Sequence, residues 1–148
     1  MSIERRCCER VEVFLLDQHD GGHLPVWLFG THEQAVLSLM VDISETGGRF
    51  LISKESPLPR LGLAVVITAI GEEKIDPLEI RAEKLWSRTD MSLTHNVMGC
   101  RYHNLPDHIK ARLSELIQKL KEMPDQQYVS CELIYDESQD LYKDSEFL

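Results

Sequence analysis

The sequence predicts a mainly β protein, an antiparallel barrel or sandwich, with one helix near its C-terminus. Between residues 11 and 103, short apolar runs alternate repeatedly with clusters of glycine, proline and polar residues, as in all-β folds. Over residues 109–120 the apolar positions become three or four apart, which is the period of a helix. A chain of 148 residues with 43% hydrophobic residues can form one domain with a proper core.

In the N-terminal part we expect a basic arm followed by strands. The arm covers residues 1–10, and residues 17–25 form a loop by composition. Strands are predicted at 11–16, 35–43 and 49–53, and the run at 25–29 is either a strand or a loop plug. The last two strands flank a glycine turn, so we expect them to pair as a hairpin.

Three further strands are predicted, at residues 61–70, 78–83 and 96–103. Residues 71–77 read as a charged turn, and residues 89–95 as a polar loop. Strict alternation at 78–83 predicts one packed face and one solvated face. The alternation slips at Lys84-Leu85-Trp86, which predicts a β-bulge there.

The helix is expected at residues 106–123. Its apolar face comprises Ile109, Leu113, Leu116, Ile117 and Leu120. Asn104 is expected to cap it, with Pro106 and Asp107 in the first turn and Pro124 as the stop. This face covers an open end of the barrel or forms a dimer seam. Residues 124–148 are expected to add one strand, at 128–135, and an acidic tail that is mobile or docked.

The net charge of −9 argues against nonspecific binding to nucleic acid or to anionic membranes. No apolar run is long enough to cross a bilayer and the N-terminus is charged, so we expect no membrane insertion and a cytoplasmic location. The four cysteines lack framework spacing and are expected to be free thiols. Against this acidic background, Arg5, Arg6 and Arg10 form a local cationic cluster that suits a small dianionic ligand.

Two short motifs carry the functional prediction. The first is Arg6-x-x-x-Arg10, in the arm, and the second is Asp42-x-Ser44-x-x-Gly47, at the glycine turn. Asp42 and Ser44 are two residues apart and therefore point to the same face of a strand. Gly47 and the adjacent Gly48 allow a sharp turn and the close approach of a ligand to the backbone.

In this order, with the arm leading into a strand, the motifs resemble those of the PilZ domain, the bacterial receptor for cyclic di-GMP. Glu79 to Trp86 and the Gly-x-x-aromatic run Gly99 to Tyr102 also lie where that family has a strand ending near a tryptophan and the strand after it. The resemblance covers residues 5–105. It implies a six-stranded antiparallel β-barrel of the split-barrel type at 11–105, whereas the helix after it is predicted from the spacing of apolar residues alone.

The ligand's chemistry suits these residues. A planar arginine fork can bond a phosphate, or the O6 and N7 atoms of guanine. A carboxylate such as Asp42 can accept the N1–H and N2–H of guanine, and Ser44 can bond a phosphate or its own turn. A base also needs a flat surface to stack on, which Trp86 or the plane of an arginine could provide. The expected ligand-binding residues are Arg5, Arg6, Arg10, Asp42, Ser44, Gly47, Gly48, Arg49 and Trp86.

We therefore expect a non-catalytic receptor that needs no cofactor and signals by a conformational change. The resemblance implies that the arm wraps the ligand against the barrel. Our mechanistic hypothesis is that ligand orders a mobile arm and that the changed surface meets or releases a downstream protein partner. One bound nucleotide and an intercalated pair are both compatible, since Arg5 precedes the motif. The alternatives are an adaptor of the same fold that binds no nucleotide and, with less support, an enzyme.

Other chemistries have weaker signals. His19, His23 and His32 show no metal-ligand spacing, and neither does Cys100 with the histidines beside it, so no metal site is expected. Cys100 and His103 are three apart on a strand and would face opposite sides, which disfavours a nucleophile–base pair. Cys7 and Cys8 lie between the two motif arginines, whose charge could lower a thiol pKa. A redox effect on ligand binding is thus a further hypothesis.

Overall fold

The structure is a computed structural model that describes residues 10–13, 30–32, 35–90, 94–123 and 128–136. The expectations for the arm at 1–9, the loop at 17–25, the run at 25–29 and the acidic tail after 136 lie outside these residues. So do Arg5 and Arg6 of the expected site, and the thiols of Cys7 and Cys8.

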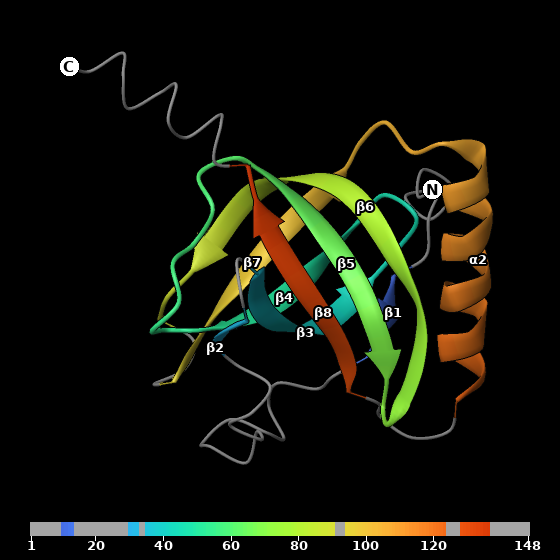
Figure 1. The fold of residues 1–148 in the computed structure, drawn as a ribbon, viewed down its shortest axis with the longest axis horizontal. Coiled ribbons are helices and arrows are strands. Elements are labelled where there is room, and N and C mark those ends of the chain that lie inside the picture. Colours follow the sequence, from blue (N-terminus) through green and yellow to red (C-terminus); the bar gives the residue numbers. More distant parts are fainter. Residues whose placement is uncertain (1–9, 14–29, 33–34, 91–93, 124–127, 137–148) are drawn as a thin grey trace, which may run out of the picture.

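Six antiparallel strands form a closed barrel, which confirms the predicted fold class (Figure 1). Their order around the barrel is β3 (Ala35–Ile43), β4 (Gly47–Ser53), β7 (His95–Tyr102), β6 (Glu73–Arg88), β5 (Gly62–Ile70) and β8 (Val129–Tyr135), and β8 pairs back onto β3. Two short strands, β1 (Val11–Glu12) and β2 (Gly30–His32), add to β3. The interior is filled by large apolar side chains from the barrel strands, such as Phe50, Met98 and Ile80.

The closing strand differs from the expectation. We expected residues 11–105 to contain the barrel and the strand near 128–135 to be an addition to it. Instead, β8 lies between β5 and β3: Leu133 pairs with Val65 on one side and with Val36 on the other. Without β8, facing edges of β3 and β5 would have unpaired backbone groups, so the barrel extends to residue 135.

Strand β6 is longer than predicted. The expected charged turn at 71–77 is reduced to Gly71, whose φ is 60°, and Glu72, and β6 begins at Glu73. Its register with β5 shifts, because Ile67 pairs with Leu78 whereas Ala69 pairs with Lys74. Pro77 falls within this irregular segment, where its missing N–H is tolerated. A second shift, between Lys84 and Trp86, confirms the predicted bulge.

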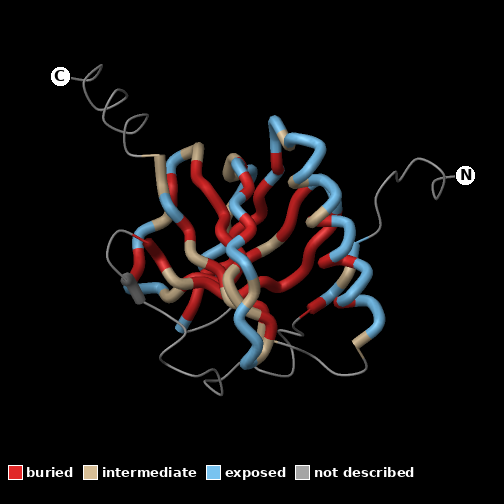
Figure 2. The backbone as a smooth tube through the Cα atoms, turned by 45° about the vertical axis from the view of Figure 1, so that its right-hand side comes forward, coloured by how far each residue is buried: buried red, intermediate tan, exposed pale blue. Residues whose placement is uncertain are grey.

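The helix α2 (Asp107–Glu122) packs on the barrel of the same chain. Its buried residues, Leu113, Leu116, Ile117 and Leu120, belong to the cluster that fills the barrel interior. Figure 2 shows most of the rest of the helix exposed, while Ile109 and Arg112 are half-buried. The Arg112 guanidinium donates to the carbonyl oxygens of Asp76, at 2.6 Å, and Pro77, at 3.2 Å. Barrel packing, rather than a dimer seam, therefore accounts for the apolar face.

The start of α2 corrects one local expectation. Asn104 is not the cap: it has a φ of 57°, and its side chain bonds that of the neighbouring His103. Pro106 takes the N-cap position, and its carbonyl oxygen accepts the N–H groups of Ile109 and Lys110. An asparagine tolerates the left-handed conformation, so Asn104 turns the chain between β7 and the helix.

Candidate functional site

A row of paired residues crosses the outer face of the barrel. Asp42 on β3 pairs with Arg49 on β4, Arg49 with Gly99 on β7, and Gly99 with Trp86 on β6. Directly paired residues point to the same face of a sheet. The next residues along two of these strands, Ile43 and Phe50, lie in the interior cluster, so this row faces outward.

Asp42 lies at one end of the row with its carboxylate fully engaged. The backbone N–H of Arg49 donates to Oδ1 at 3.1 Å, and its Nε donates to Oδ2 at 2.6 Å. Nη1 of Arg10 lies 3.5 Å from the same Oδ2. The Asp42 side chain is 0% exposed, whereas that of Arg10 is 50% exposed. A buried carboxylate requires such partners, because an unpaired buried charge is costly.

The short strand β1 brings Arg10 to this point. Val11 pairs with Ile43, and Glu12 pairs with Asp42. The Val13 N–H donates to the carbonyl oxygen of Val41 at 2.9 Å, which continues the contact beyond the strand. Arg10 therefore enters beside Asp42, and Oε2 of Glu12 lies 3.8 Å from Nη2 of Arg49. The two motifs, far apart in sequence, are joined by side-chain contact.

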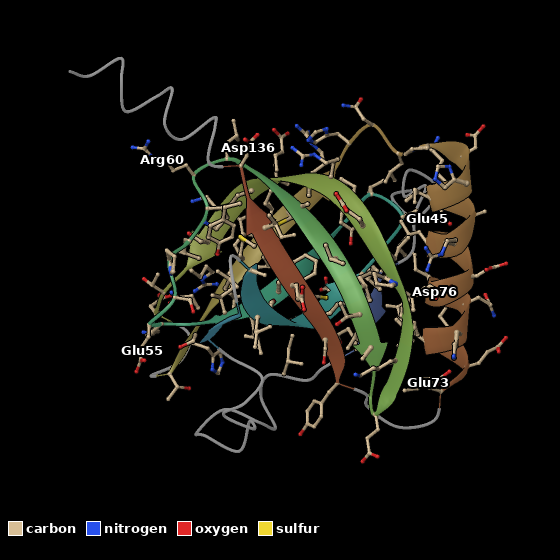
Figure 3. The ribbon with its side chains drawn as sticks, in the orientation of Figure 1. Glu45, Glu55, Arg60, Glu73, Asp76 and Asp136 are labelled. Carbon is tan, nitrogen blue, oxygen red and sulfur yellow. The ribbon has the colours of Figure 1, made fainter. Side chains whose placement is uncertain are left out.

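Ser44 bonds within its own turn, one of the two roles considered for it. Its N–H donates to the Gly47 carbonyl oxygen at 2.8 Å, and its hydroxyl reaches the same oxygen at 3.3 Å. The Thr46 N–H donates to Ser44 Oγ at 3.2 Å. The side chain is buried, so Ser44 shapes the tip of the β3–β4 hairpin, where Glu45 is labelled in Figure 3.

The two glycines are required by the close approach of neighbouring backbones. A Cβ on Gly47 would lie 2.2 Å from the carbonyl oxygen of Cys100, on β7. A Cβ on Gly48 would lie 2.7 Å from the carbonyl oxygen of Asp42 and 3.1 Å from the Tyr102 hydroxyl. Any side chain at either position would push β4 away from its neighbours. These contacts between strands explain why both positions are glycine. The sequence had instead led us to expect that the glycines give a ligand access to the backbone.

Trp86 lies with the face of its indole ring over Gly99. Three adjacent ring atoms, Cε2, Nε1 and Cζ2, are 2.3, 2.5 and 2.6 Å from the point that a Cβ on Gly99 would occupy. Cε2 is bonded to both other atoms and is the nearest of the three, so the point lies above the ring rather than beyond its edge. The opposite face points outward, and Trp86 is 38% exposed. The row therefore ends in a flat aromatic surface.

Within the described residues, the structure groups Arg10, Asp42, Ser44, Gly47, Gly48 and Arg49 at one end of the barrel. Trp86 lies two strands from Arg49 in the same row. From the sequence, no role in the site was expected for Gly99, for Glu12 or for Arg101, which is two residues from Gly99. The alternation of side chains along β7 could have indicated Arg101 as a site residue, because Arg101 and Gly99 share a face of the strand.

The cysteine–histidine pair does not form a nucleophilic site. Cys100 is buried, and burial raises the pKa of its thiol to about 12, against an opposing effect of Lys84. The thiolate is the nucleophilic form, so Cys100 is unreactive at neutral pH. His103 is exposed, and its ring bonds the Asn104 side chain.

Buried Tyr102 has an unusual hydroxyl. Burial raises its pKa well above the ordinary value for tyrosine, with smaller contributions from Cys131, Cys100 and Asp42. Among the described residues this hydroxyl has no hydrogen-bond partner. It lies on the inner side of Gly48, so it belongs to the core beneath the row rather than to the outer surface.

In the part of the chain that the structure describes, no three His, Cys, Asp or Glu side chains gather as a metal site requires. No helix in that part is long and apolar enough to cross a membrane. His19 and His23, considered as ligands above, lie outside the described residues. In comparisons with known proteins, no family model, no curated protein and no solved structure matches this chain.

Proposed function

We propose that this chain is a non-catalytic receptor for cyclic di-GMP, as its resemblance to the PilZ domain implies. The observation that carries the proposal is the contact between Arg10 and Asp42. These residues come from the two motifs on which the resemblance rests, and they meet on the outer face of a six-stranded barrel. A chance pairing of an arginine motif and a turn motif would have no reason to bring them together.

The chemistry of the row supports a guanine nucleotide with phosphates. The half-exposed Arg10 guanidinium presents a planar fork of donors, which suits a phosphate or the O6 and N7 atoms of guanine. The outward face of Trp86 provides a surface on which a base can stack. Arg49 lies between Asp42 and Gly99, within the same row.

The contacts of Asp42 suggest how the site changes when ligand binds. Arg49 holds Asp42 through two hydrogen bonds, the shorter at 2.6 Å, whereas Arg10 approaches only to 3.5 Å. An ion pair at this distance, with a half-exposed arginine, contributes less stability than the short Arg49 contact. Arg10 can therefore exchange Asp42 for the ligand at small cost, and the Asp42 oxygen that it leaves can accept a guanine N–H. Arg49 keeps the carboxylate neutralised throughout.

A route for signalling runs through β1. Val11 follows Arg10 directly and packs against the interior cluster to which the apolar face of α2 belongs. Ligand contact with the arm would thus change how β1 packs against α2, and a downstream protein partner would read that surface. Hydrogen exchange with and without cyclic di-GMP tests this route: increased protection of residues 1–13 is expected, and unchanged protection would refute it.

The binding test is calorimetric titration of the full chain with cyclic di-GMP. We expect saturable binding by the wild type and a loss of about 100-fold or more in the Arg6→Ala, Arg10→Ala double variant, because two charge-assisted interactions are removed. The control is Lys74→Ala with Lys110→Ala, which removes two charges from exposed positions on β6 and α2 and should leave the affinity nearly unchanged.

The stoichiometry of the titration would distinguish one bound nucleotide from two. Equal losses in both double variants would mean that only overall charge matters, which contradicts the proposed site. No binding by the wild type would refute the receptor function. The alternative of an adaptor with the same fold would then become the leading hypothesis.

A further inference from the structure

We infer that Arg101 is a further ligand-contacting residue, which binds a phosphate of the ligand and is held ready by Glu83 until the ligand arrives. This inference rests on the proposed function, because it assigns an additional residue to the same site. Neither binding motif contains Arg101, which occupies an unspecified position of the Gly-x-x-aromatic run Gly99 to Tyr102. Its position, exposure and partner carry the argument.

The position comes from the register of the sheet. Arg101 on β7 pairs with Gly47 on β4 and with Glu83 on β6. This row lies next to the row of Asp42, Arg49, Gly99 and Trp86, on the same outer face, since Arg101 and Gly99 are two residues apart on one strand. Arg101 is therefore a neighbour of the indole that covers Gly99.

The surroundings of Arg101 leave its guanidinium accessible from the site. Gly47, its cross-strand neighbour, has no side chain that could stand between Arg101 and the β3–β4 turn. A ligand stacked on Trp86 and bonded to Arg10 would lie across the two rows, so a phosphate bordering the base would come within reach of Arg101. The other side of the Trp86 row is different: there Arg88 pairs with the buried apolar residue Val97.

The partner of Arg101 is a partly exposed carboxylate. Nη2 of Arg101 forms an ion pair with Oε1 of Glu83. An exposed pair of this kind adds little stability, so the guanidinium can leave it. Each phosphodiester of the ligand carries one negative charge, as a carboxylate does, and its two free oxygens can accept two parallel N–H groups from the fork. Glu83 therefore orients Arg101 in the free protein and competes weakly with the ligand.

The barrel offers a matched control for this pair. Arg81 is on β6, as Glu83 is, and its Nη2 lies 3.7 Å from Oδ2 of Asp136. The exposed fractions are similar: 61% and 27% for Arg101 and Glu83, against 50% and 30% for Arg81 and Asp136. Arg81 is two residues before Glu83 on β6, on the side away from Trp86. Its partner, Asp136, directly follows β8. Asp136 and the turn residue Glu45 are well separated in Figure 3.

The first comparison is titration of the full chain and its variants Arg101→Gln and Arg81→Gln with cyclic di-GMP. Arg101→Gln is expected to weaken binding about tenfold and to make the affinity less dependent on salt concentration, because one charge-assisted phosphate contact is lost. Arg81→Gln should change the affinity less than about twofold, since it alters only the general electrostatic potential. Thermal unfolding of both variants checks that they remain folded.

The second comparison removes the competing carboxylate. Glu83→Gln and Asp136→Asn each change the net charge by the same amount, so long-range attraction of the ligand rises equally in both. If Glu83 competes for Arg101, Glu83→Gln should tighten binding several-fold more than Asp136→Asn does. Equal effects within each pair of variants would overturn the role of Arg101 and leave the receptor function intact. No binding by the wild type would overturn both.

Discussion

At the scale of single residues, Asp42 organises the candidate site. It is a fully buried carboxylate, and it bonds the backbone and side chain of Arg49 while Arg10 approaches the same oxygen. Because the two guanidiniums keep access to water, the group holds three charges together without burying a net charge. Asp42 thus positions the guanidiniums of Arg10 and Arg49, whether or not it contacts a ligand itself.

Replacing Asp42 with Asn tests this role. The amide can still accept one N–H of Arg49, but it removes the charge partner of Arg10 and leaves Arg49 only the longer contact with Glu12, at 3.8 Å. We expect the free energy of unfolding to fall by about 1–3 kcal/mol, less than for a fully buried pair, since both arginines are partly exposed. Urea denaturation measures it. Glu12→Gln, which removes an exposed carboxylate near Arg49, should cost below about 0.5 kcal/mol. Equal losses for both would show that Asp42 is not the organising charge.

At the scale of elements, the helix α2 is held by its apolar face and by Arg112. Four of its side chains are buried with the barrel interior, and Arg112 donates to two carbonyl groups at the irregular start of β6. The lengthened segment around Pro77 thus offers carbonyl oxygens that a regular ladder would use within the sheet. The irregular segment of β6 and the position of α2 therefore depend on each other through these hydrogen bonds.

Truncating the buried face of α2 should therefore destabilise the whole barrel. For Leu113→Ala we expect a loss of about 3 kcal/mol in the free energy of unfolding, the usual cost of a buried leucine. The next residue is a matched control: Ser114→Ala, on the exposed face, should change it by less than about 0.5 kcal/mol. Chemical denaturation measures both. A small loss for Leu113→Ala, together with dissociation of an oligomer, would instead favour the dimer seam.

At the scale of the whole molecule, closure of the barrel depends on its last strand. Val129, Cys131 and Leu133 of β8 are buried in the interior, and the backbone of β8 pairs with both β5 and β3. The chain thus cannot complete its sheet until residues near its C-terminal end have joined the first long strand. Such contacts between distant segments are typical of slowly folding β proteins.

Two truncations separate the barrel from the tail. A chain ending at residue 136 keeps β8 and should unfold cooperatively, close to the full-length protein. A chain ending at residue 127 lacks β8, exposes the edges of β3 and β5 and loses three buried side chains, so it should show no cooperative transition. Thermal unfolding followed by circular dichroism distinguishes them. Cooperative unfolding of the shorter chain would contradict the closing role of β8.

The sequence by itself determined those features that depend on neighbouring residues. The periods of two and of 3.6 are local properties of a chain, so the pattern predicted β3 with its observed ends, the alternating burial of Leu78, Ile80 and Ala82, and the buried face of α2. The broken alternation at Lys84–Trp86 predicted the bulge for the same reason. The two motifs are likewise visible in the sequence, but the sequence does not show how close Arg10 and Asp42 lie in space.

Only the tertiary structure decided which distant segments meet. The insertion of β8 between β5 and β3, the contact of Arg10 with Asp42, and the cover of Gly99 by Trp86 all depend on the register between separate strands. A shift of one residue in any pairing would turn these side chains to the other face of the sheet. Register is set by packing of the closed barrel as a whole, and no local pattern in the sequence encodes it.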